Sequence, residues 1–272
     1  MKNILEAPFM KELCRCISNM YRLGYDERNG GNISYLLKQE DLEEYLDLSK
    51  VIREIPMGFE AKPLIGKYFI VTATGSYFRN VEHDPEDNLG IIRVKDDGVT
   101  AELMWGYADG GQFTSELPAH LMAHMVRLEK DPESRVVTHC HPNNILAMTY
   151  VLPIDDKIFT RELWQMETEC MVIFPEGVGV LPWMLCGTNS IGEATAQKMA
   201  DDYRIVVWAQ HGIYGCGKTL DEAFGLIETV EKAATIYMMT AGFKRINTIT
   251  DDNLRQIAKR YGVTPREGFL ED

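Results

Sequence analysis

The stretch that decides the fold class is Ile205-Val206-Val207-Trp208-Ala209-Gln210-His211-Gly212-Ile213-Tyr214-Gly215-Cys216-Gly217-Lys218-Thr219. Its first four residues are apolar and predict a buried strand. The last eight residues match G-x-x-x-x-G-K-[ST], the pattern of a phosphate-binding loop. A long helix is predicted directly afterwards, over 220–241. The stretch is therefore either a nucleotide-hydrolase loop or a glycine-rich strand-to-helix turn with Thr219 as the helix N-cap.

Two observations weigh against the nucleotide hydrolase. Such an enzyme needs a second apolar strand ending in Asp, which holds the magnesium ion. The residues after Thr219 predict two helices and no such strand, and the apolar run 170–174 is followed by Pro175-Glu176. His211, directly before the loop, has no part in the pattern either. We therefore expect an ordinary glycine-rich turn here.

Strands and helices intermix along the rest of the chain. Apolar runs predict strands over 33–37, 68–73, 91–94, 99–104, 136–139, 170–174, 178–181 and 205–208. Helices are predicted over 7–23, 40–55, 116–130 with Thr114 or Ser115 as N-cap, 143–150, 191–201, 220–241 and 251–261. Asp96-Asp97-Gly98 is a hairpin signal and favours some antiparallel pairing. With no internal repeat or linker, we expect one α/β or α+β domain spanning 1–272.

Composition excludes several classes of protein. The 272 residues are 45% hydrophobic and 25% charged, with a net charge of −13, which is ordinary for a globular protein and untypical of a disordered one. The acidity argues against a nucleic-acid partner. The N-terminal residues lack the apolar stretch of a signal peptide, and no run reaches membrane-span length, so no membrane partner is expected. Six cysteines without a C-x-x-C pair indicate a reducing cytoplasm.

The strongest local signal for chemistry is His139-Cys140-His141, at the end of a predicted strand. Residues i and i+2 of a strand point to the same face, so the two imidazoles lie side by side. Zinc accepts histidine nitrogen readily, and His211, at the end of another strand, is an attractive third ligand. Spacing alone leaves a surface-facing pair, or one satisfied in the core, as the alternative.

A rival metal site lies on one predicted helix. Glu116, His120 and His124 are spaced by four residues and share one helical face. The H-E-x-x-H pattern is absent, because Leu121-Met122-Ala123 separate the two histidines. This face therefore more simply lines the core or a cleft.

Three segments could bind an anion without a basic patch. Asn29-Gly30-Gly31-Asn32 exposes backbone N–H groups, and Thr74-Gly75-Ser76 offers hydroxyls after a strand. Thr114-Ser115 adds hydroxyls at a helix N-terminus, where the helix dipole is positive. Each segment alone is more simply an ordinary turn or cap. Together they would supply the local positive potential that a protein of net charge −13 needs to hold a small anion.

The order of these motifs is more specific than any one of them. Asp26-Glu27-Arg28-Asn29-Gly30-Gly31-Asn32, Thr72-Ala73-Thr74-Gly75-Ser76, Thr114-Ser115-Glu116, His139-Cys140-His141 and His211-Gly212 follow one another along the chain. This series resembles the class II aldolase/adducin family of zinc sugar-phosphate aldolases, nearly from end to end. Segments 114–120, 159–164 and 262–265 add to the resemblance, and the length of 36–68 points to one of the family's longer branches.

The resemblance implies a single class II aldolase/adducin-like domain, with a central, mainly antiparallel sheet flanked by helices. It implies an aldehyde-lyase that cleaves a ketose 1-phosphate by a retro-aldol reaction, with one zinc ion per subunit. It also implies a fourfold symmetric homotetramer with sites at the subunit interfaces.

The resemblance also assigns residues to roles. His139, His141 and His211 would bind the zinc ion, and Glu116 would be the nearby acid/base. Glu169 would reach into the site of a neighbouring subunit as a second proton-transfer group. Asn29, Asn32, Thr74, Gly75, Thr114 and Ser115 would lie around the phosphate and the sugar oxygens. One departure affects phosphate binding: the usual turn reads T-G-S-G-K, whereas 72–76 keeps a hydroxyl at Thr74 and lacks the lysine.

Two other functions fit the same scaffold. A pentose-phosphate 4-epimerase would share the retro-aldol step but return one isomer. A non-enzymatic assembly module, like the adducin head, would need none of the three histidines or Glu116, and all four are present.

Overall fold

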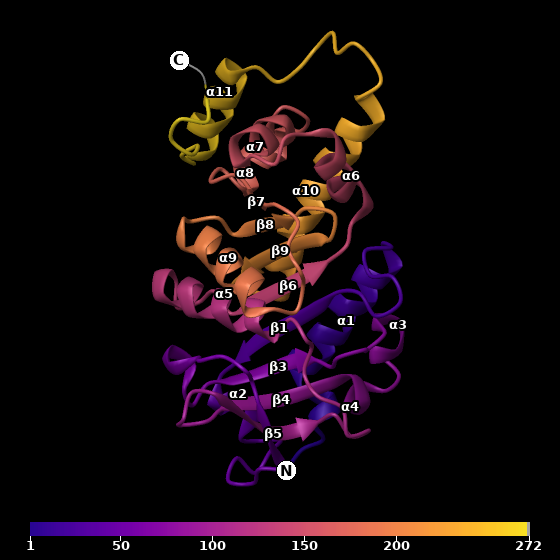
Figure 1. Cartoon of the computed structure of the whole chain (residues 1–272), viewed down its shortest axis with the longest axis vertical. Helices are drawn as coiled ribbons and strands as arrows, with labels where there is room; N and C mark the ends of the chain where they lie inside the picture. Colours follow the sequence, from indigo (N-terminus) through magenta and orange to yellow (C-terminus); the bar gives the residue numbers. More distant parts are fainter. Residues whose placement is uncertain (271–272) are drawn as a thin grey trace.

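The computed structural model describes residues 1–270, whose strands form a nine-stranded sheet in the order β2-β5-β4-β3-β1-β6-β9-β8-β7 (Figure 1). The strands are β1 Asn32–Leu37, β2 Arg53–Pro56, β3 Tyr68–Thr72, β4 Leu89–Val94, β5 Thr100–Gly106, β6 Val136–Cys140, β7 Gly179–Leu181, β8 Ile205–Trp208 and β9 Gly212–Gly217. Neighbouring strands are antiparallel except β7 and β8. The expected mainly antiparallel sheet flanked by helices is confirmed.

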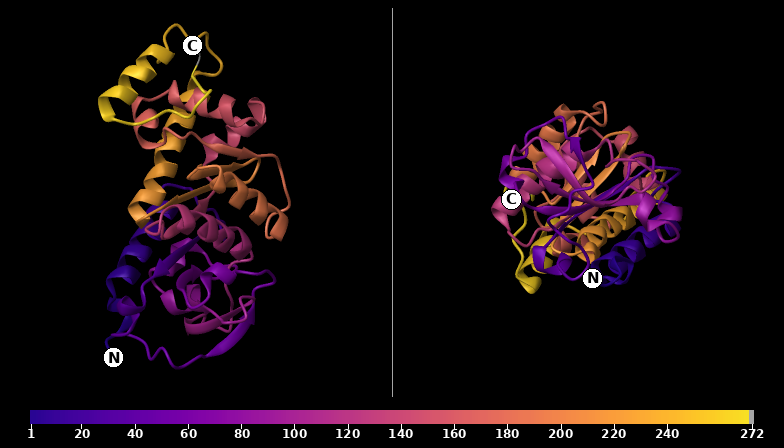
Figure 2. Two further views of the ribbon diagram at one scale, coloured as in Figure 1. Left: turned by 90° about the vertical axis from the view of Figure 1, so that its left-hand side faces the viewer. Right: turned by 90° about the horizontal axis from the view of Figure 1, so that it is seen from below.

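Helices cover both faces of this sheet (Figure 2). They are α1 Pro8–Arg22, α2 Gln39–Leu42, α3 Phe78–Val81, α4 Pro85–Asn88, α5 Leu117–Lys130, α6 Asn143–Val151, α7 Asp156–Trp164, α8 Thr168–Ile173, α9 Asn189–Ala200, α10 Leu220–Thr240 and α11 Asp251–Tyr261. Alternate residues of each strand point to opposite faces. Ile70 of β3 therefore packs in the cluster that contains α1 and α10, whereas Phe69 and Val71 pack with α5. None of the helices within residues 1–270 combines the length and hydropathy needed to span a membrane.

The stretch that decided the fold class is a strand pair. Residues 212–217 form β9, which pairs with β6 and β8, so the phosphate-loop hypothesis is wrong. The glycines make room for α10, because a Cβ at Gly215 or Gly217 would lie 2.7 or 2.8 Å from the backbone of Ala223. Our expectation of a turn was also wrong over 212–217, but Thr219 is the N-cap of α10 and accepts from the Glu222 amide at 3.1 Å.

Two other predicted elements were wrong. In the segment 40–55 only α2 is helical, and the chain then turns into β2, which pairs with β5. The run 170–174 is not a strand, since residues up to Ile173 belong to α8. This helix buries Cys170 and Met171. Helix α5 begins at Leu117 with Glu116 at the N-cap position, one or two residues later than expected. The strands β2 and β9 and the helices α3, α4 and α7 were not predicted.

Two buried histidines on α5 make stability depend on pH. Burial lowers the pKa of His120 and of His124 to about 3. Both stay neutral in the folded state below pH 6.5, where histidines of the unfolded chain take up protons. The unfolded state then binds more protons, so the free energy of unfolding decreases as the pH decreases. Between pH 7.5 and 5.5 each buried histidine is expected to cost about 1.4 kcal/mol.

Urea unfolding tests this expectation. Wild type and His124→Gln are compared at pH 7.5 and 5.5, with a chelator present so that metal release contributes to neither. The wild type should lose about 1.4 kcal/mol more than the variant between the two pH values. Equal losses would contradict a neutral, buried His124.

Candidate active site

One cleft collects residues from six separate segments of the sequence. Because β1 is antiparallel to β3 and β6, and β6 to β9, the ends of β3 and β6 meet the starts of β1 and β9. The cleft has a volume of about 340 Å³. It is lined by Glu27, Arg28, Asn29, Gly30, Gly31, Asn32, Ala73, Thr74, Gly75, Thr114, Ser115, Glu116, His141, Cys186 and His211.

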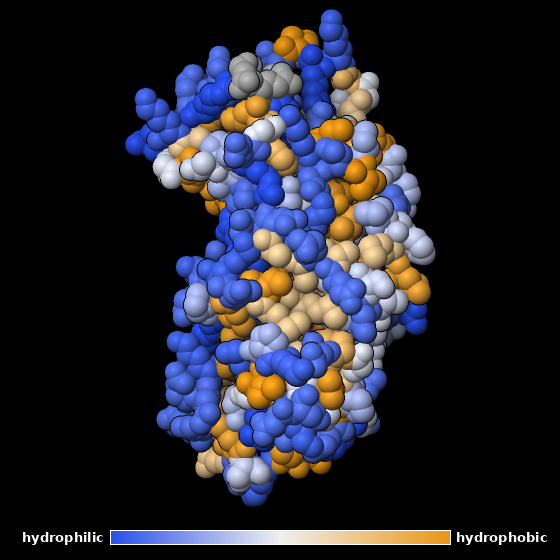
Figure 3. Space-filling view, turned by 60° about the vertical axis from the view of Figure 1, so that its left-hand side comes forward, coloured by the Kyte–Doolittle hydropathy of each residue, from blue (hydrophilic) through white to orange (hydrophobic). Residues whose placement is uncertain are grey.

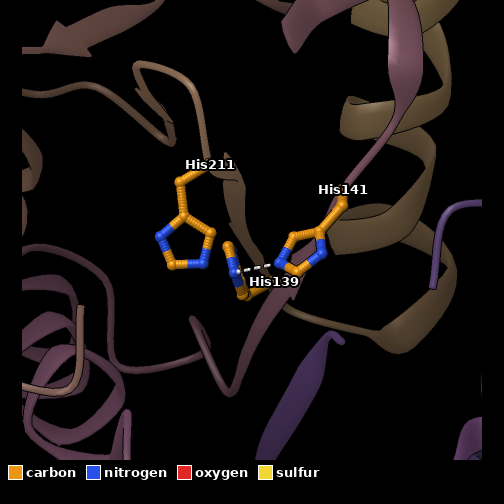
Figure 4. A group of neighbouring side chains, drawn as sticks. All are labelled: His139, His141 and His211. Carbon is orange, nitrogen blue, oxygen red and sulfur yellow. Dashed lines mark hydrogen bonds between the residues drawn. The ribbon is translucent and has the colours of Figure 1, made fainter. Parts of the chain in front are cut away.

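The three histidines singled out from the sequence converge beside this cleft (Figure 4). One ring nitrogen from each of His139, His141 and His211 lies within 4.8 Å of the other two. His139 is fully buried at the end of β6, and His141 follows it at the cleft wall. His211 reaches the same point from the turn between β8 and β9, where Gln210 has a φ of 56°.

Hydrogen-bond acceptors beside His139 and His141 determine that Nδ1 of each ring carries a hydrogen. Nδ1 of His139 donates to the Ile213 carbonyl at 3.1 Å, and Nδ1 of His141 donates to the Glu27 carboxylate at 3.0 Å. The two Nε2 atoms lie 3.2 Å apart (Figure 4, dashed line), and in neutral rings with these Nδ1 hydrogens both present lone pairs. Two facing lone pairs repel unless a cation lies between them. This donor set therefore fits a divalent metal bound by neutral imidazoles, and carboxylates or carbonyls on the far nitrogens are typical of such sites.

Burial favours the neutral form of His139 and of His211. Burial, with the neighbouring His141 and His211, lowers the pKa of His139 well below its ordinary value. Burial also lowers the pKa of His211, against the opposing charge of Glu116. Neutral imidazole is the form that binds metal ions.

Glu116 lies against the histidines. Its Oε2 is 3.4 Å from Nε2 of His139, and its Oε1 is 3.5 Å from Nε2 of His211. Tyr214 donates its hydroxyl to Oε2 at 3.0 Å, and Asn32 donates its amide to the same oxygen at 2.9 Å. Burial, followed by the Glu116 charge, raises the pKa of Tyr214 well above its usual range, so this phenol remains a donor. The carboxylate is held within reach of anything bound at the three nitrogens.

The three segments expected to bind an anion meet at the same cleft. Asn29, Thr74, Gly75 and Ser115 line it, as does Thr114, whose hydroxyl also accepts from the Glu116 amide at 3.2 Å. Ser76 follows Gly75 where the family's turn usually has a lysine, and one cation that lines the cleft had no predicted role. That cation is Arg28, which donates to the Tyr77 hydroxyl at 3.3 Å. The sequence also predicted no role for Tyr214 or Glu27. Pairing of β9 with β6 places Tyr214 here, and the turn before β1 places Glu27.

Two sequence-derived candidates lie elsewhere. Glu169 is exposed on α8 and is absent from the lining of the cleft. His120 and His124 both bond to Ser34, at 2.8 and 2.9 Å, so the predicted core-lining role holds and the rival metal site is not formed. Figure 1 places α8 beyond the β7 edge, far along the molecule from β1 and β3.

The turn before β1 allows no side chain at Gly31. Its φ is 79°, and a Cβ there would lie 1.8 Å from Oδ1 of the buried Asp26. Gly31→Ala is expected to lower the free energy of unfolding by about 3 kcal/mol or more, and to displace Asn29 and Asn32 from the cleft. Gly66→Ala is the matched control, because Gly66 has a φ of 76° with no atom within 4 Å. It should cost about 1 kcal/mol. Urea unfolding of both variants checks this, and equal losses would contradict the steric account.

Comparisons with known proteins agree with this geometry. A sequence profile described as "Class II Aldolase and Adducin N-terminal domain" matches residues 11–238. The chain belongs to this family. The rhamnulose-1-phosphate aldolase of Listeria monocytogenes serotype 4b is 55% identical over 100% of this chain and 99% of its own length. The rhamnulose-1-phosphate aldolase of Enterococcus faecalis is 53% identical over 99% and 97%.

Solved structures of two aldolases share the fold. A sugar-phosphate aldolase from Thermotoga maritima superposes with a TM-score of 0.74, at 28% identity, over 87% of this chain and 96% of its own. An L-fuculose 1-phosphate aldolase superposes with a TM-score of 0.61 at 18% identity, over 94% and 97%. The second likeness supports the fold alone.

Proposed function

We propose that this chain is an aldehyde-lyase that cleaves L-rhamnulose 1-phosphate to dihydroxyacetone phosphate and L-lactaldehyde, in the catabolism of L-rhamnose. The observation that carries the proposal is the convergence of three histidine nitrogens within 4.8 Å, with Glu116 within 3.5 Å of two of them. Relatives named rhamnulose-1-phosphate aldolase, 55% and 53% identical over nearly the whole of both chains, support the substrate.

The proposed cofactor is zinc, one ion per subunit, held by His139, His141 and His211. The Nδ1 hydrogens of His139 and His141 are donated to other partners, and their Nε2 lone pairs face each other. This arrangement suits a bound zinc ion. When bound, the ion supplies a Lewis acid for the negative charge that develops when a bond between carbon atoms breaks. Three neutral ligands leave its double charge available for that task.

Glu116 is proposed to move the proton at C3. Cleavage of the C3–C4 bond leaves an electron pair on C3, which must receive a proton, while the hydroxyl on C4 must lose one. Glu116 is held by Asn32 and Tyr214 at 2.9 and 3.0 Å, beside the histidine cluster. A positioned carboxylate of this kind serves as a general acid or base. Glu169, exposed on α8, is proposed to serve the C4 hydroxyl in a neighbouring subunit.

The phosphate is proposed to bind in the anion-binding segments, which line the cleft together. Backbone and hydroxyl donors of Asn29, Thr74, Gly75, Thr114 and Ser115 would hold its oxygens, with Asn32 at the sugar end. The N-terminus of α5 adds a positive dipole end, and Arg28 supplies a charge at the rim. This arrangement provides local positive potential inside a chain of net charge −13.

The chain is further proposed to form a homotetramer as a single-domain enzyme of the cytoplasm. Several large apolar side chains are exposed, including Trp183, Leu185, Phe243 and Ile246. Figure 3 shows apolar residues gathered around the middle of one face, as a self-associating surface requires. The cysteines among residues 1–270 are all free thiols, as expected in a reducing compartment.

Product analysis on a panel of sugar phosphates tests the function. The panel contains L-rhamnulose 1-phosphate, L-fuculose 1-phosphate and a pentulose 5-phosphate. The proposal expects the highest kcat/KM for L-rhamnulose 1-phosphate, with two three-carbon products. A single isomerised product from the pentulose phosphate, with no cleavage of either ketose 1-phosphate, would identify a 4-epimerase instead. A protein inactive on all three would fit the non-enzymatic assembly module.

A further inference from the structure

A chain of buried polar side chains runs from the interior of the protein to Glu116. Its members are Asn32, His120, Ser34 and His124, and the last three are fully inaccessible to solvent. We propose that His120, held by Ser34 and His124, is a positioning residue that fixes the Asn32 amide so that its N–H points at Glu116. This inference rests on the acid/base role proposed for Glu116.

The contacts are continuous from one end to the other. Asn32 Nδ2 lies 2.9 Å from Glu116 Oε2, and Asn32 Oδ1 is bonded to His120 Nε2. The other ring nitrogen of His120, Nδ1, lies 2.8 Å from the Ser34 hydroxyl. That hydroxyl is 2.9 Å from His124 Nε2.

The chemistry of these groups gives every hydrogen bond one direction. A carboxylate only accepts, so Asn32 must present its amide nitrogen to Glu116 and its carbonyl oxygen to His120. His120 Nε2 then carries the hydrogen, and the bare Nδ1 accepts from the Ser34 hydroxyl. That hydroxyl in turn accepts from the Nε2 hydrogen of His124. Donors therefore point towards Glu116 along the whole chain.

Two further observations agree with this direction. Burial holds both histidines neutral, with pKa values of about 3, and a neutral imidazole has one hydrogen to donate. The scheme leaves His124 Nδ1 as a bare acceptor, and that atom is buried without a hydrogen-bond partner among residues 1–270. The series of hydrogen bonds thus ends on the lone pair of His124 Nδ1, and none of its N–H groups is left without an acceptor.

The arrangement matters for Glu116 because an amide torsion is soft. The terminal torsion of asparagine is broad and roughly two-fold, so Asn32 alone could turn its oxygen towards the carboxylate. The Nε2 hydrogen of His120 favours one of the two orientations. Removal of such a supporting partner typically costs 10–100-fold in activity.

Two substitutions of His120 separate positioning from general support. In His120→Leu the donor is lost, and kcat for the proposed substrate should fall about 10–100-fold, with KM and bound zinc unchanged. In His120→Gln the side-chain amide can place an N–H near the former Nε2, and kcat should recover to within about threefold of wild type. Combining His120→Leu with Asn32→Ala should be no slower than Asn32→Ala alone, because His120 acts through Asn32.

Tyr107→Phe is the matched control for losing a buried hydrogen bond. Its hydroxyl donates to the Val71 carbonyl at 3.1 Å and to none of the four side chains Asn32, Ser34, His120 and His124. The control should keep wild-type kcat with a comparable loss of thermal stability. A fall in kcat that matches the loss of stability in all these variants, with no recovery in His120→Gln, would overturn the proposal in favour of a merely structural role.

A crystal structure of His120→Leu gives a readout that does not depend on activity. The proposal expects the Asn32 amide to turn or move away from Glu116 Oε2, beyond hydrogen-bond distance. An unchanged 2.9 Å contact would overturn it. If the wild type cleaved no sugar phosphate, the proposed function would fail, while this structure would still decide the positioning of Asn32.

Discussion

His141→Ala is expected to lose the bound zinc and to lower kcat for L-rhamnulose 1-phosphate by about 1000-fold or more. The substitution removes one of three converging nitrogens and leaves the Glu27 carboxylate, 3.0 Å from Nδ1, without its partner. Two remaining histidines form an incomplete ligand set for a tightly held zinc ion. Elemental analysis of the purified variant and an assay for dihydroxyacetone phosphate measure the two losses together.

His83→Ala is the control for this experiment. His83 is exposed and is absent from the lining of the cleft, so its removal should change neither zinc content nor turnover. A His141→Ala protein that kept one zinc ion per subunit would show that the metal is bound elsewhere.

Glu116→Gln is expected to lower kcat by about 100- to 10,000-fold while the protein stays folded and keeps its zinc. The substituted amide preserves the shape of the side chain and can still accept from Asn32 and Tyr214, but it cannot take up or deliver the proton at C3. The effect should fall on kcat, because the ring nitrogens that hold the metal are unchanged. Steady-state kinetics and elemental analysis give the separation.

Glu102→Gln is the matched carboxylate control, because Glu102 pairs with Arg93 at 2.6 Å on β4 and β5, outside the cleft lining. It should retain wild-type kcat. A Glu116→Gln enzyme with wild-type kcat would transfer the acid/base role to another group, and Glu169 of a neighbouring subunit would be the next candidate.

Strand periodicity was enough to predict the proximity of the first two histidines. Residues i and i+2 at the end of a predicted strand share a face, and the Nε2 atoms of His139 and His141 lie 3.2 Å apart. The third ligand followed from a different rule, that polar residues collect at strand ends. The order of the motifs along the sequence then allowed the family to be recognised, and in the structure residues 29–32, 73–75 and 114–116 line one cleft.

The errors arose where local pattern and tertiary packing disagree. Residues 212–217 lack the alternation of a half-buried strand, because three of them are glycines and all six are buried. The motif therefore looked like a loop, and only pairing with β6 and β8 makes it a strand. The short edge strand β2 carries one buried residue, Ile55, too weak a signal to separate it from the acidic segment before it.

Contacts between distant segments could not be predicted from the sequence, because they depend on tertiary packing. Tyr214 reaches Glu116 only because β9 lies beside β6, and Asn32 meets His120 across 88 residues of chain. Sequence spacing brought Glu116, His120 and His124 onto one helical face as a rival metal site. In the structure Glu116 lines the cleft, whereas both histidines are bonded to Ser34 in the interior.

Metal-dependent cleavage at the histidine cluster can be tested by removing and restoring the metal. Purified protein is assayed with L-rhamnulose 1-phosphate as isolated, after removal of metal by a chelator, and after reloading with zinc, with metal content determined at each stage. We expect one zinc ion per subunit, equal amounts of dihydroxyacetone phosphate and L-lactaldehyde, loss of cleavage on chelation, and recovery on reloading. Cleavage at the full rate by metal-free protein would contradict it.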